Sequence, residues 1–194
     1  MDEGGRKEEI LKAAQTVFSQ YGYHQATIRM IADQAQCATG TFYLYFVSKQ
    51  DCFLALVEQL YTHVMEQIMR ARFGVDDPAE KLKRSLDAAV NVFRRDYELA
   101  QVVLVRGAGA DPLFEERMWR VREAFSEFIV SDLIECGLDR ERAVIGAQAW
   151  VGALAEIVGV WIRRDQDLDL NEAAQEVHRI FWTAWGLNDF HSTL

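Results

Sequence analysis

The sequence has little proline and little that resembles a β-strand. Only two of its 194 residues are proline, Pro78 and Pro112, and stretches in which apolar and polar residues alternate are rare. Strands are recognised by that alternation between turn residues, so its scarcity predicts an all-α protein. Half of the residues are hydrophobic, which is enough for a packed core and argues against extensive disorder.

Neither the cysteines nor the histidines have the spacing of a catalytic or metal site. The three cysteines are Cys37, Cys52 and Cys136. Their odd number and their spacing suit no small disulfide scaffold, and we expect small buried side chains in a reducing compartment. The four histidines are His24, His63, His178 and His191. None has ligand spacing to another histidine or to a carboxylate pair, and no nucleophile motif occurs. We therefore predict a protein that is not an enzyme and holds no metal and no cofactor.

Hydropathy and charge limit the partners of this chain. A secretory segment and an uncharged run long enough to cross a bilayer are both lacking, so we expect a cytoplasmic protein without a membrane partner. The net charge of −9 opposes nucleic-acid binding, but it is unevenly distributed. Residues 1–50 hold five basic and five acidic side chains, whereas residues 51–194 hold 16 basic and 25 acidic ones. The neutral N-terminal part can therefore approach a phosphate backbone.

Apolar residues at helical spacing predict a series of helices. Gly22 is suited to end the first of them in a left-handed conformation, and Thr27 and Ser48 are suited to cap the second and the fourth. The predicted helices cover residues 6–21, 27–34, 38–44, 49–72, 78–97, 98–106, 112–136, 139–164 and 171–187.

Residues 27–49 have the layout of a helix-turn-helix that reads DNA. Two short helical patterns are separated by a tight break at 36–37. In such a motif the second helix lies in the major groove while the first braces it across the backbone. A helix that approaches DNA closely needs small or hydroxylated residues on its exposed face, and residues 38–41, Ala-Thr-Gly-Thr, have that character.

The aromatic residues that follow divide between the core and the surface. We expect Phe42 and Phe46, four residues apart, to point into the core. The hydroxyls of Tyr43 and Tyr45 then face outward, where they can reach phosphate oxygens. Lys49, in the first turn of the next helix, has both a free N–H group and a cation that suit a phosphate. Thr27 and Arg29 begin the bracing helix and have the same opportunity.

Three segments together resemble the N-terminal signature of the TetR family of bacterial transcriptional regulators. They read Ala-Thr-Ile-Arg-Met-Ile-Ala, Gly-Thr-Phe-Tyr-Leu-Tyr-Phe and Ser-Lys-Gln-Asp, and the resemblance covers about residues 8–60. It implies a helix-turn-helix DNA-binding domain at 1–48 and an effector-binding and dimerisation domain at 49–194. It also implies DNA contacts from Thr27, Arg29, Thr39, Gly40, Thr41, Tyr43, Tyr45 and Lys49.

Four positions depart from the usual pattern of that family. Gln36 stands where the turn commonly has glycine and is expected to hold a positive φ. Ala38 replaces a hydroxyl that caps the recognition helix, and Met30 replaces an acidic partner of the Thr27 cap. Thr39 stands where a basic residue is frequent. Fewer charges on the reading face predict weak nonspecific affinity and a small salt dependence.

The last two predicted helices are candidates for a homodimer interface. The helix over 139–164 is apolar on several sides and must pack on more than one neighbour. Both helices could instead belong to the core of one monomer, but a helix-turn-helix reader needs two-fold pairing to cover two half-sites. The candidate interface residues are Val151, Val158, Val177, Ile180, Phe181, Ala184 and Trp185.

A small, largely apolar effector is expected to bind between the middle helices. Each candidate could equally be plain core, and Arg106 and Arg120 could bind an acidic effector group or stabilise helix ends. The candidate lining residues are Phe93, Leu99, Val103, Arg106, Trp119, Arg120, Phe125, Phe128, Trp150 and Leu154.

A weaker resemblance concerns the effector itself. Residues 22–25, 40–46 and 161–170 are similar to those of fatty-acyl-CoA-responsive regulators of fatty-acid degradation in the same family. This resemblance implies an apolar tunnel with basic residues near its mouth for a CoA phosphate. The function it indicates is a repressor that binds a palindromic operator as a dimer and is released by an effector such as a long-chain acyl-CoA. The alternatives are a multidrug-responsive repressor of an efflux gene and a helical interaction module without DNA binding.

Overall fold

The computed structural model describes residues 3–107 and 109–187, and within those ranges the chain forms helices and no strand. The all-α prediction is therefore confirmed. His191, one of the four histidines, lies outside the described residues. The helices are α1 (Glu3–Gln25), α2 (Ile28–Gln34), α3 (Thr39–Tyr43), α4 (Lys49–Arg72), α5 (Pro78–Arg95), α6 (Tyr97–Gln101), the π-helical η1 (Val102–Arg106), α7 (Pro112–Glu135), α8 (Arg140–Arg163) and α9 (Leu170–Ala184).

Two of the predicted helices are built differently from the expectation. Gly22 does break the first helix, with φ 71° and ψ 166°, but the chain resumes helical structure and α1 runs on to Gln25. The segment expected as one helix over 98–106 is an α-helical turn followed by the π-helical turn η1. Apolar spacing indicates only that a segment is helical, and it does not distinguish an α-turn from a π-turn.

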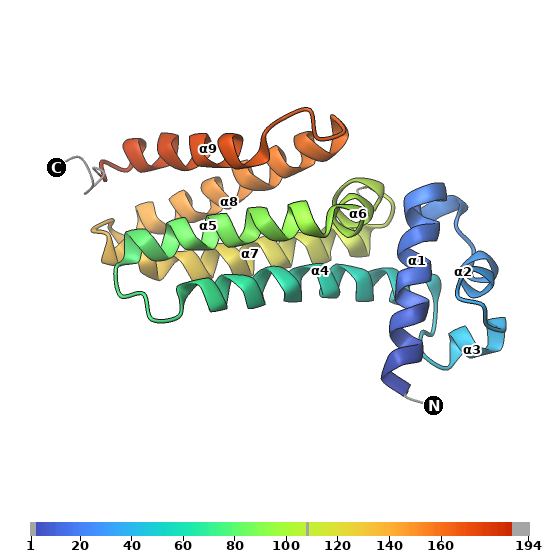
Figure 1. The fold of residues 1–194 in the computed structure, drawn as a ribbon. Coiled ribbons are helices and arrows are strands. Elements are labelled where there is room, and N and C mark those ends of the chain that lie inside the picture. The colour runs from blue at the N-terminus through green and yellow to red at the C-terminus, as the bar shows by residue number, and fades with distance from the viewer. Residues whose placement is uncertain (1–2, 108, 188–194) are drawn as a thin grey trace. The chain divides into compact units, whose positions relative to one another are not determined.

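The contacts group the chain into two compact units. One takes in the residues up to 63 together with 96–118, and the other takes in 64–95 and the residues from 119 onward. Within the first unit, α2 packs on α1 and α3 on α2, while α6 and η1 pack against α1 (Figure 1). The predicted division at residues 48 and 49 concerns function, and it stays a prediction because contacts alone do not say which residues bind DNA.

An aromatic cluster forms part of the core of the first unit. The rings of Phe53 and Phe114 stack with their centroids 4.3 Å apart, and the Tyr23 ring meets both edge-on at 5.4 and 4.8 Å. Gly107, directly after η1, lies against this cluster. A Cβ atom there would overlap with Cζ of Phe53, so the close packing of this turn requires glycine.

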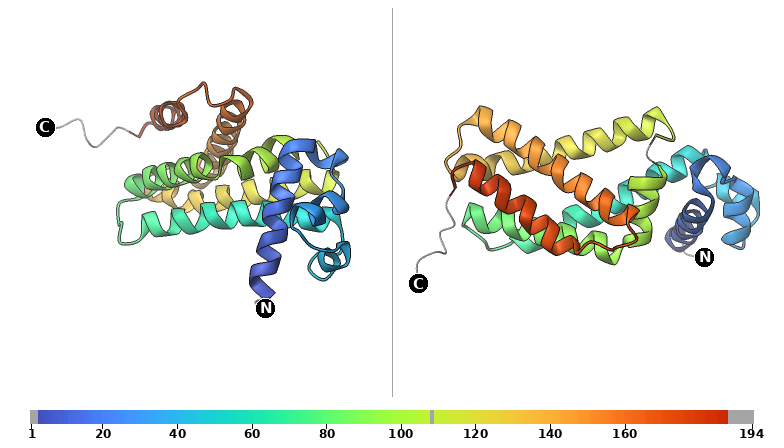
Figure 2. Two further views of the ribbon diagram at one scale, coloured as in Figure 1. Left: turned by 45° about the vertical axis from the view of Figure 1, so that its right-hand side comes forward. Right: turned by 90° about the horizontal axis from the view of Figure 1, so that it is seen from above.

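The second unit is held together by α8 and α9, which run antiparallel, and by α5, which packs on α9 (Figures 1 and 2). A buried ion pair joins its other helices. The guanidinium of Arg72 donates to both carboxylate oxygens of Asp132, at 2.6 and 2.8 Å, and to Oγ of Ser85 at 3.1 Å. Asp132 is buried, and the same guanidinium lies 4.5 Å from the ring centroid of Phe128. This charged group is therefore fully engaged inside the unit.

One helix among the described residues, α8, is long and apolar enough to cross a membrane by those criteria alone. Its most apolar stretch is 33% buried within the chain. Ala143, Ala147, Trp150 and Trp161 are buried, so one apolar face of α8 packs inside the fold. Other apolar residues of α8, among them Ile145, Val151 and Leu154, are only partly covered.

Candidate nucleic-acid interface

The bracing helix α2 begins at the predicted cap. The hydroxyl of Thr27 accepts a hydrogen bond from the backbone N–H of Met30 at 3.2 Å, which satisfies one of the free N–H groups of the first turn. The first turn contains no acidic residue, as expected from Met30. Arg29 is strongly exposed, and its contact with Asp33, at 3.9 Å, joins two exposed side chains. Such a pair contributes little and leaves Arg29 available to another partner.

The turn between α2 and α3 holds a non-glycine residue in a left-handed conformation. Gln36 has a φ of 52°, which confirms the expectation for this position. For a residue with a Cβ atom that conformation costs about 1–2 kcal/mol. The N–H groups of Gln36 and Cys37 donate to the carbonyls of Asp33 and Ala32 at 3.1 and 2.9 Å, which closes the end of α2.

The helix α3 is short and is anchored by aromatic side chains. Phe42 and Phe46 are buried, as predicted, with their ring centroids 5.6 Å apart. The residue before α3, Ala38, has no side-chain group that could cap it. Burial of these two rings, rather than capping, therefore holds the five residues of α3 in place.

The opposite face of α3 is exposed and consists of small and hydroxylated residues. Thr39 and Gly40 are exposed, and 54% of Tyr43 is accessible to solvent. Thr41 and Tyr45 are half-buried, so Tyr45 faces outward less than predicted. A Cβ atom built on Gly40 would have no described atom within 4 Å. The fold therefore does not require glycine there, although glycine weakens a helix by about 1 kcal/mol relative to alanine. Glycine at such a position is typical of a surface that approaches another molecule closely.

Lys49 lies in a different environment from the one its sequence position indicates. Its ammonium donates to the backbone carbonyls of Tyr23 and Ala26, at 2.6 and 2.8 Å, and lies 4.4 Å from the centroid of the Tyr23 ring. Burial lowers the pKa of this ammonium group. The cation therefore closes the C-terminal end of α1, where carbonyl groups lack partners. Its backbone N–H, at the first residue of α4, is the part suited to a phosphate.

The start of α4 is fixed by a reciprocal cap. The N–H of Asp51 donates to Oγ of Ser48 at 3.0 Å, and the N–H of Val47 donates to the Asp51 carboxylate at 3.1 Å. Ser48 is thus the predicted cap, and the Asp51 carboxylate binds the backbone directly before it. This arrangement fixes the residue at which α4 begins.

Two apolar side chains beside α3 are strongly exposed and were not among the predicted contacts. Leu44 is 79% exposed and Val47 is 82% exposed. Next to a DNA-reading helix, such groups are suited to the methyl groups of thymine, which are read by apolar contact in the major groove. The available signal was their position in the sequence, since Leu44 directly follows Tyr43 and Val47 directly follows Phe46.

The candidate effector residues are divided between the two units. Leu99, Val103 and Arg106 belong to the first unit and the other seven to the second. Leu99, Val103 and Trp150 are buried; Phe93, Phe125, Phe128 and Leu154 are half-buried; Arg106, Trp119 and Arg120 are exposed. The indole N–H of Trp150 is buried and has no hydrogen-bond partner among the described residues, although an unmet buried donor is unfavourable. Within those residues no group of three potential metal ligands occurs.

The candidate interface residues also differ in exposure. Val158 is buried within its own chain, while Val151, Val177, Phe181 and Trp185 are half-buried. Ala184 is exposed, and Ile180 is 52% exposed. Ile145 of α8 is exposed to a similar degree. The free apolar surface of this helix pair therefore lies mainly around Ile145, Ile180 and Ala184.

The family described as bacterial regulatory proteins of the tetR family matches residues 10–56, which include α2, α3 and the start of α4. The fatty acid metabolism regulator protein of Bacillus subtilis is 28% identical over 170 residues, 84% of this chain and 86% of that protein. The transcriptional activator FasR of Mycolicibacterium smegmatis is 24% identical over 179 residues, 91% of this chain and 81% of that protein.

Solved structures match over almost the whole chain. The fatty acid degradation regulator FadR of Bacillus halodurans superposes with a TM-score of 0.80 at 26% identity, covering 93% of this chain and 96% of that one. FadR of Bacillus subtilis in complex with stearoyl-CoA has a TM-score of 0.77 at 24% identity, with coverage of 90% and 96%. The first match agrees in both sequence and fold, and the second shows a common fold. Together with the helix-turn-helix at its N-terminus, these findings show that residues 10–56 belong to the tetR family of bacterial regulatory proteins, a family of DNA-binding proteins rather than enzymes, and that the chain as a whole has the fold of such regulators.

Proposed function

We propose that this protein is a ligand-responsive repressor that binds a palindromic operator as a homodimer. The observation that carries this proposal is the exposed face of α3, with Thr39, Gly40 and Tyr43 turned to solvent and glycine at a position where the fold does not require it. In the proposed complex each α3 enters a major groove, and the two half-sites lie about one helical turn apart. The contacts come from the eight residues predicted for DNA binding, with Lys49 contributing its backbone N–H.

The free apolar surface of α8 and α9 supports the homodimer. The most apolar stretch of α8 is 33% buried within the chain, and Ile145 and Ile180 are more than half exposed. A two-fold axis brings the same surface of two copies together, so a patch that includes these residues can cover itself. Pairing through these helices is also what two operator half-sites require.

The effector that we propose is a small, largely apolar molecule, with long-chain acyl-CoA as the first candidate. Support comes from the similarity to two fatty acid regulators and from the stearoyl-CoA complex of the Bacillus subtilis protein. Within the second unit of this chain, the aromatic candidates Phe93, Trp119, Phe125, Phe128 and Trp150 provide apolar surface for an acyl chain. The unpartnered indole N–H of Trp150 offers a hydrogen bond to a ligand oxygen.

The contact between α1 and the α6–η1 segment is the proposed route by which the state of the protein reaches α3. Ser19 of α1 donates to Gln101 at 3.2 Å, and η1 packs against α1. A π-helical turn can revert to α-helix with a change of register, and such turns are frequent at functional sites. An effector that binds one arrangement of this segment more tightly shifts the population and lowers the affinity for DNA.

A selection from random DNA duplexes, followed by a gel-shift titration of the enriched sequence, tests this function. We expect a two-fold symmetric site, one shifted species at dimer stoichiometry and release by stearoyl-CoA. Stearate, free CoA and a lipophilic cationic dye are tested in the same assay for comparison with stearoyl-CoA. Release by the dye alone supports the multidrug-responsive alternative and contradicts acyl-CoA, whereas failure to enrich any sequence supports an interaction module without DNA binding.

A further inference from the structure

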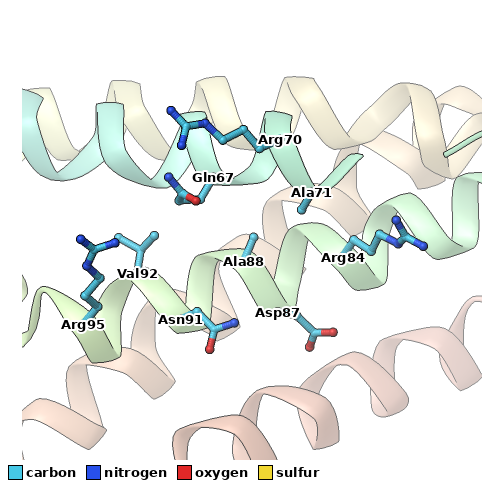
Figure 3. A pocket seen from close by; sticks show the side chains of 9 residues that line it. All are labelled: Gln67, Arg70, Ala71, Arg84, Asp87, Ala88, Asn91, Val92 and Arg95. Carbon is cyan, nitrogen blue, oxygen red and sulfur yellow. The ribbon is translucent and has the colours of Figure 1, made fainter. Parts of the chain in front are cut away.

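A groove of about 490 Å³ lies between α4 and α5 of the second unit. Its size falls within the roughly 300–1,000 Å³ of small-molecule sites. The lining residues are Gln67, Arg70, Ala71, Arg84, Asp87, Ala88, Asn91, Val92 and Arg95 (Figure 3). None of the candidate effector residues is among them. The groove is therefore a feature that the proposed apolar site leaves unexplained.

The segment that contains the groove, residues 64–95, has a net positive charge, opposite in sign to that of the chain. Residues 64–95 hold seven basic and five acidic side chains, whereas residues 96–194 hold nine basic and 18 acidic ones. The groove itself has three arginines and a single carboxylate, that of Asp87. In a protein of net charge −9, such a local excess of cations focuses anions at this face.

The arginines of the groove are not used to hold the fold together. Among the described residues, no hydrogen bond or ion pair is made by the side chain of Arg70 or of Arg95, whereas the side chain of Arg72, two positions along α4, is fully engaged with Asp132. Arg84 donates through Nε to Glu80 at 2.8 Å, which leaves its terminal N–H groups. Planar guanidinium groups with free donors match phosphate oxygens in pairs.

The positions of the arginines favour an extended ligand. Figure 3 shows Arg84 and Arg95 at opposite ends of the groove along α5, with Arg70 on α4 between them and Asp87 pointing away from α4. Residues 84 and 95 are separated by roughly 16 Å along the axis of a helix. A single small anion could therefore contact the arginine at only one end of the groove. Between the ends, Ala71, Ala88 and Val92 contribute short apolar side chains, and Gln67 contributes an amide.

We propose that this groove binds a nucleotide carrying a diphosphate group. Arg70 and one of the two α5 arginines would hold the phosphates, and the strip of small apolar residues would receive the planar base. The chemistry is shared by a free nucleoside diphosphate and by the CoA portion of an acyl-CoA. The proposal does not depend on the nature of the apolar effector, because the groove and its charges belong to α4 and α5 alone.

Calorimetric titration of the full-length protein with ADP and with free CoA tests the groove. The groove variant is Arg70→Gln/Arg95→Gln, and the control is Arg122→Gln/Arg140→Gln, which removes the same charge from exposed positions elsewhere in the second unit. We expect both ligands to bind the wild type, the groove variant to bind them at least about tenfold more weakly, and the control to change by about twofold or less. Equal melting temperatures of the three proteins establish that all are folded.

Stearoyl-CoA separates the two sources of the diphosphate. If stearoyl-CoA binds more tightly than ADP and CoA, and the groove variant weakens its binding by the same factor as theirs, the groove is assigned to the CoA portion of the effector. If ADP and CoA bind equally and stearoyl-CoA binds no more tightly than they do, the groove is assigned to a free nucleotide. Absence of binding at millimolar ADP and CoA, or equal losses in both double variants, overturns the proposal. If the groove variant loses ADP affinity but releases the operator at an unchanged stearoyl-CoA concentration, the groove is likewise assigned to a free nucleotide, and the proposed repressor function is left intact.

Discussion

The reading head, residues 27–49, and the helical body, residues 64–95 and 119–187, use polar side chains in different ways. In the head, Thr39 and Tyr43 face solvent, and the fold itself does not explain why they have hydroxyl groups. In the body, Arg72 and Asp132 face each other inside and are explained by the fold alone. An external partner of constant geometry restricts the residue types of the head, whereas a core can be filled by many combinations of apolar residues. The head therefore has a recognisable signature and the body does not.

The largest expected effect comes from disrupting the buried, inward-facing ion pair of the body. Asp132→Ala leaves the guanidinium of Arg72 without its carboxylate, and removal of one partner of a buried pair costs about 3–5 kcal/mol of unfolding free energy. Urea denaturation of the purified protein measures the loss. Glu135→Gln on the same helix is the control, because its contact with Lys81 is long, at 3.8 Å, and its side chain is 55% exposed. Equal losses in the two variants would contradict a special role of the buried pair.

The outward-facing side is tested by Tyr43→Phe, which removes one hydroxyl from the reading face. If that hydroxyl donates to a phosphate, a charge-assisted hydrogen bond of about 1.5–3 kcal/mol is lost, and operator affinity falls about tenfold or more. The melting temperature should not change, since the hydroxyl has no role in the fold. Tyr21→Phe, on the exposed part of α1, is the matched control in the same gel-shift assay, and a similar loss there would show that the effect is not specific to α3.

Lys49→Met tests whether the Lys49 side chain belongs to the polar side chains that hold the fold together or to those that face a partner. Because its ammonium holds the carbonyls of Tyr23 and Ala26, we expect a loss of about 1–3 kcal/mol in unfolding free energy, measured by urea denaturation. Lys12→Met, which removes an exposed lysine from α1, should leave stability nearly unchanged. If the Lys49 variant keeps full stability but loses DNA binding, the side chain contacts DNA and does not stabilise the fold.

The smallest expected effect concerns the turn of the head. Gln36→Gly relieves a residue held at φ 52°, but glycine also increases the entropy of the unfolded chain, so the net gain should be about 1 kcal/mol or less. Thermal unfolding measures it, with Gln34→Gly at the end of α2 as the control that should destabilise. A loss of stability at position 36 would show that the Gln36 side chain contributes contacts that offset the strain.

Sequence reasoning was most accurate where a residue acts on its near neighbours. The caps at Thr27 and Ser48 and the positive φ of Gln36 depend on residues within four positions. The burial of Phe42 and Phe46 was predicted from their spacing of four residues. The break at Gly22 was placed correctly, although α1 continues beyond it. The candidate DNA contacts were found by the same local pattern, and their roles on DNA remain predictions.

What the sequence by itself determined is the set of helices, their caps and turns, and a reading face of small and hydroxylated residues. The tertiary structure alone decided that the ammonium of Lys49 binds carbonyls 23 and 26 positions earlier, that Arg72 pairs with Asp132 across 60 positions, and that Arg70 and Arg95 meet at one groove. The physical reason is distance along the chain. A cap or a turn is an interaction among neighbours that the residue types specify, whereas the partner of a long, flexible cation depends on which helices packing brings within a few ångströms.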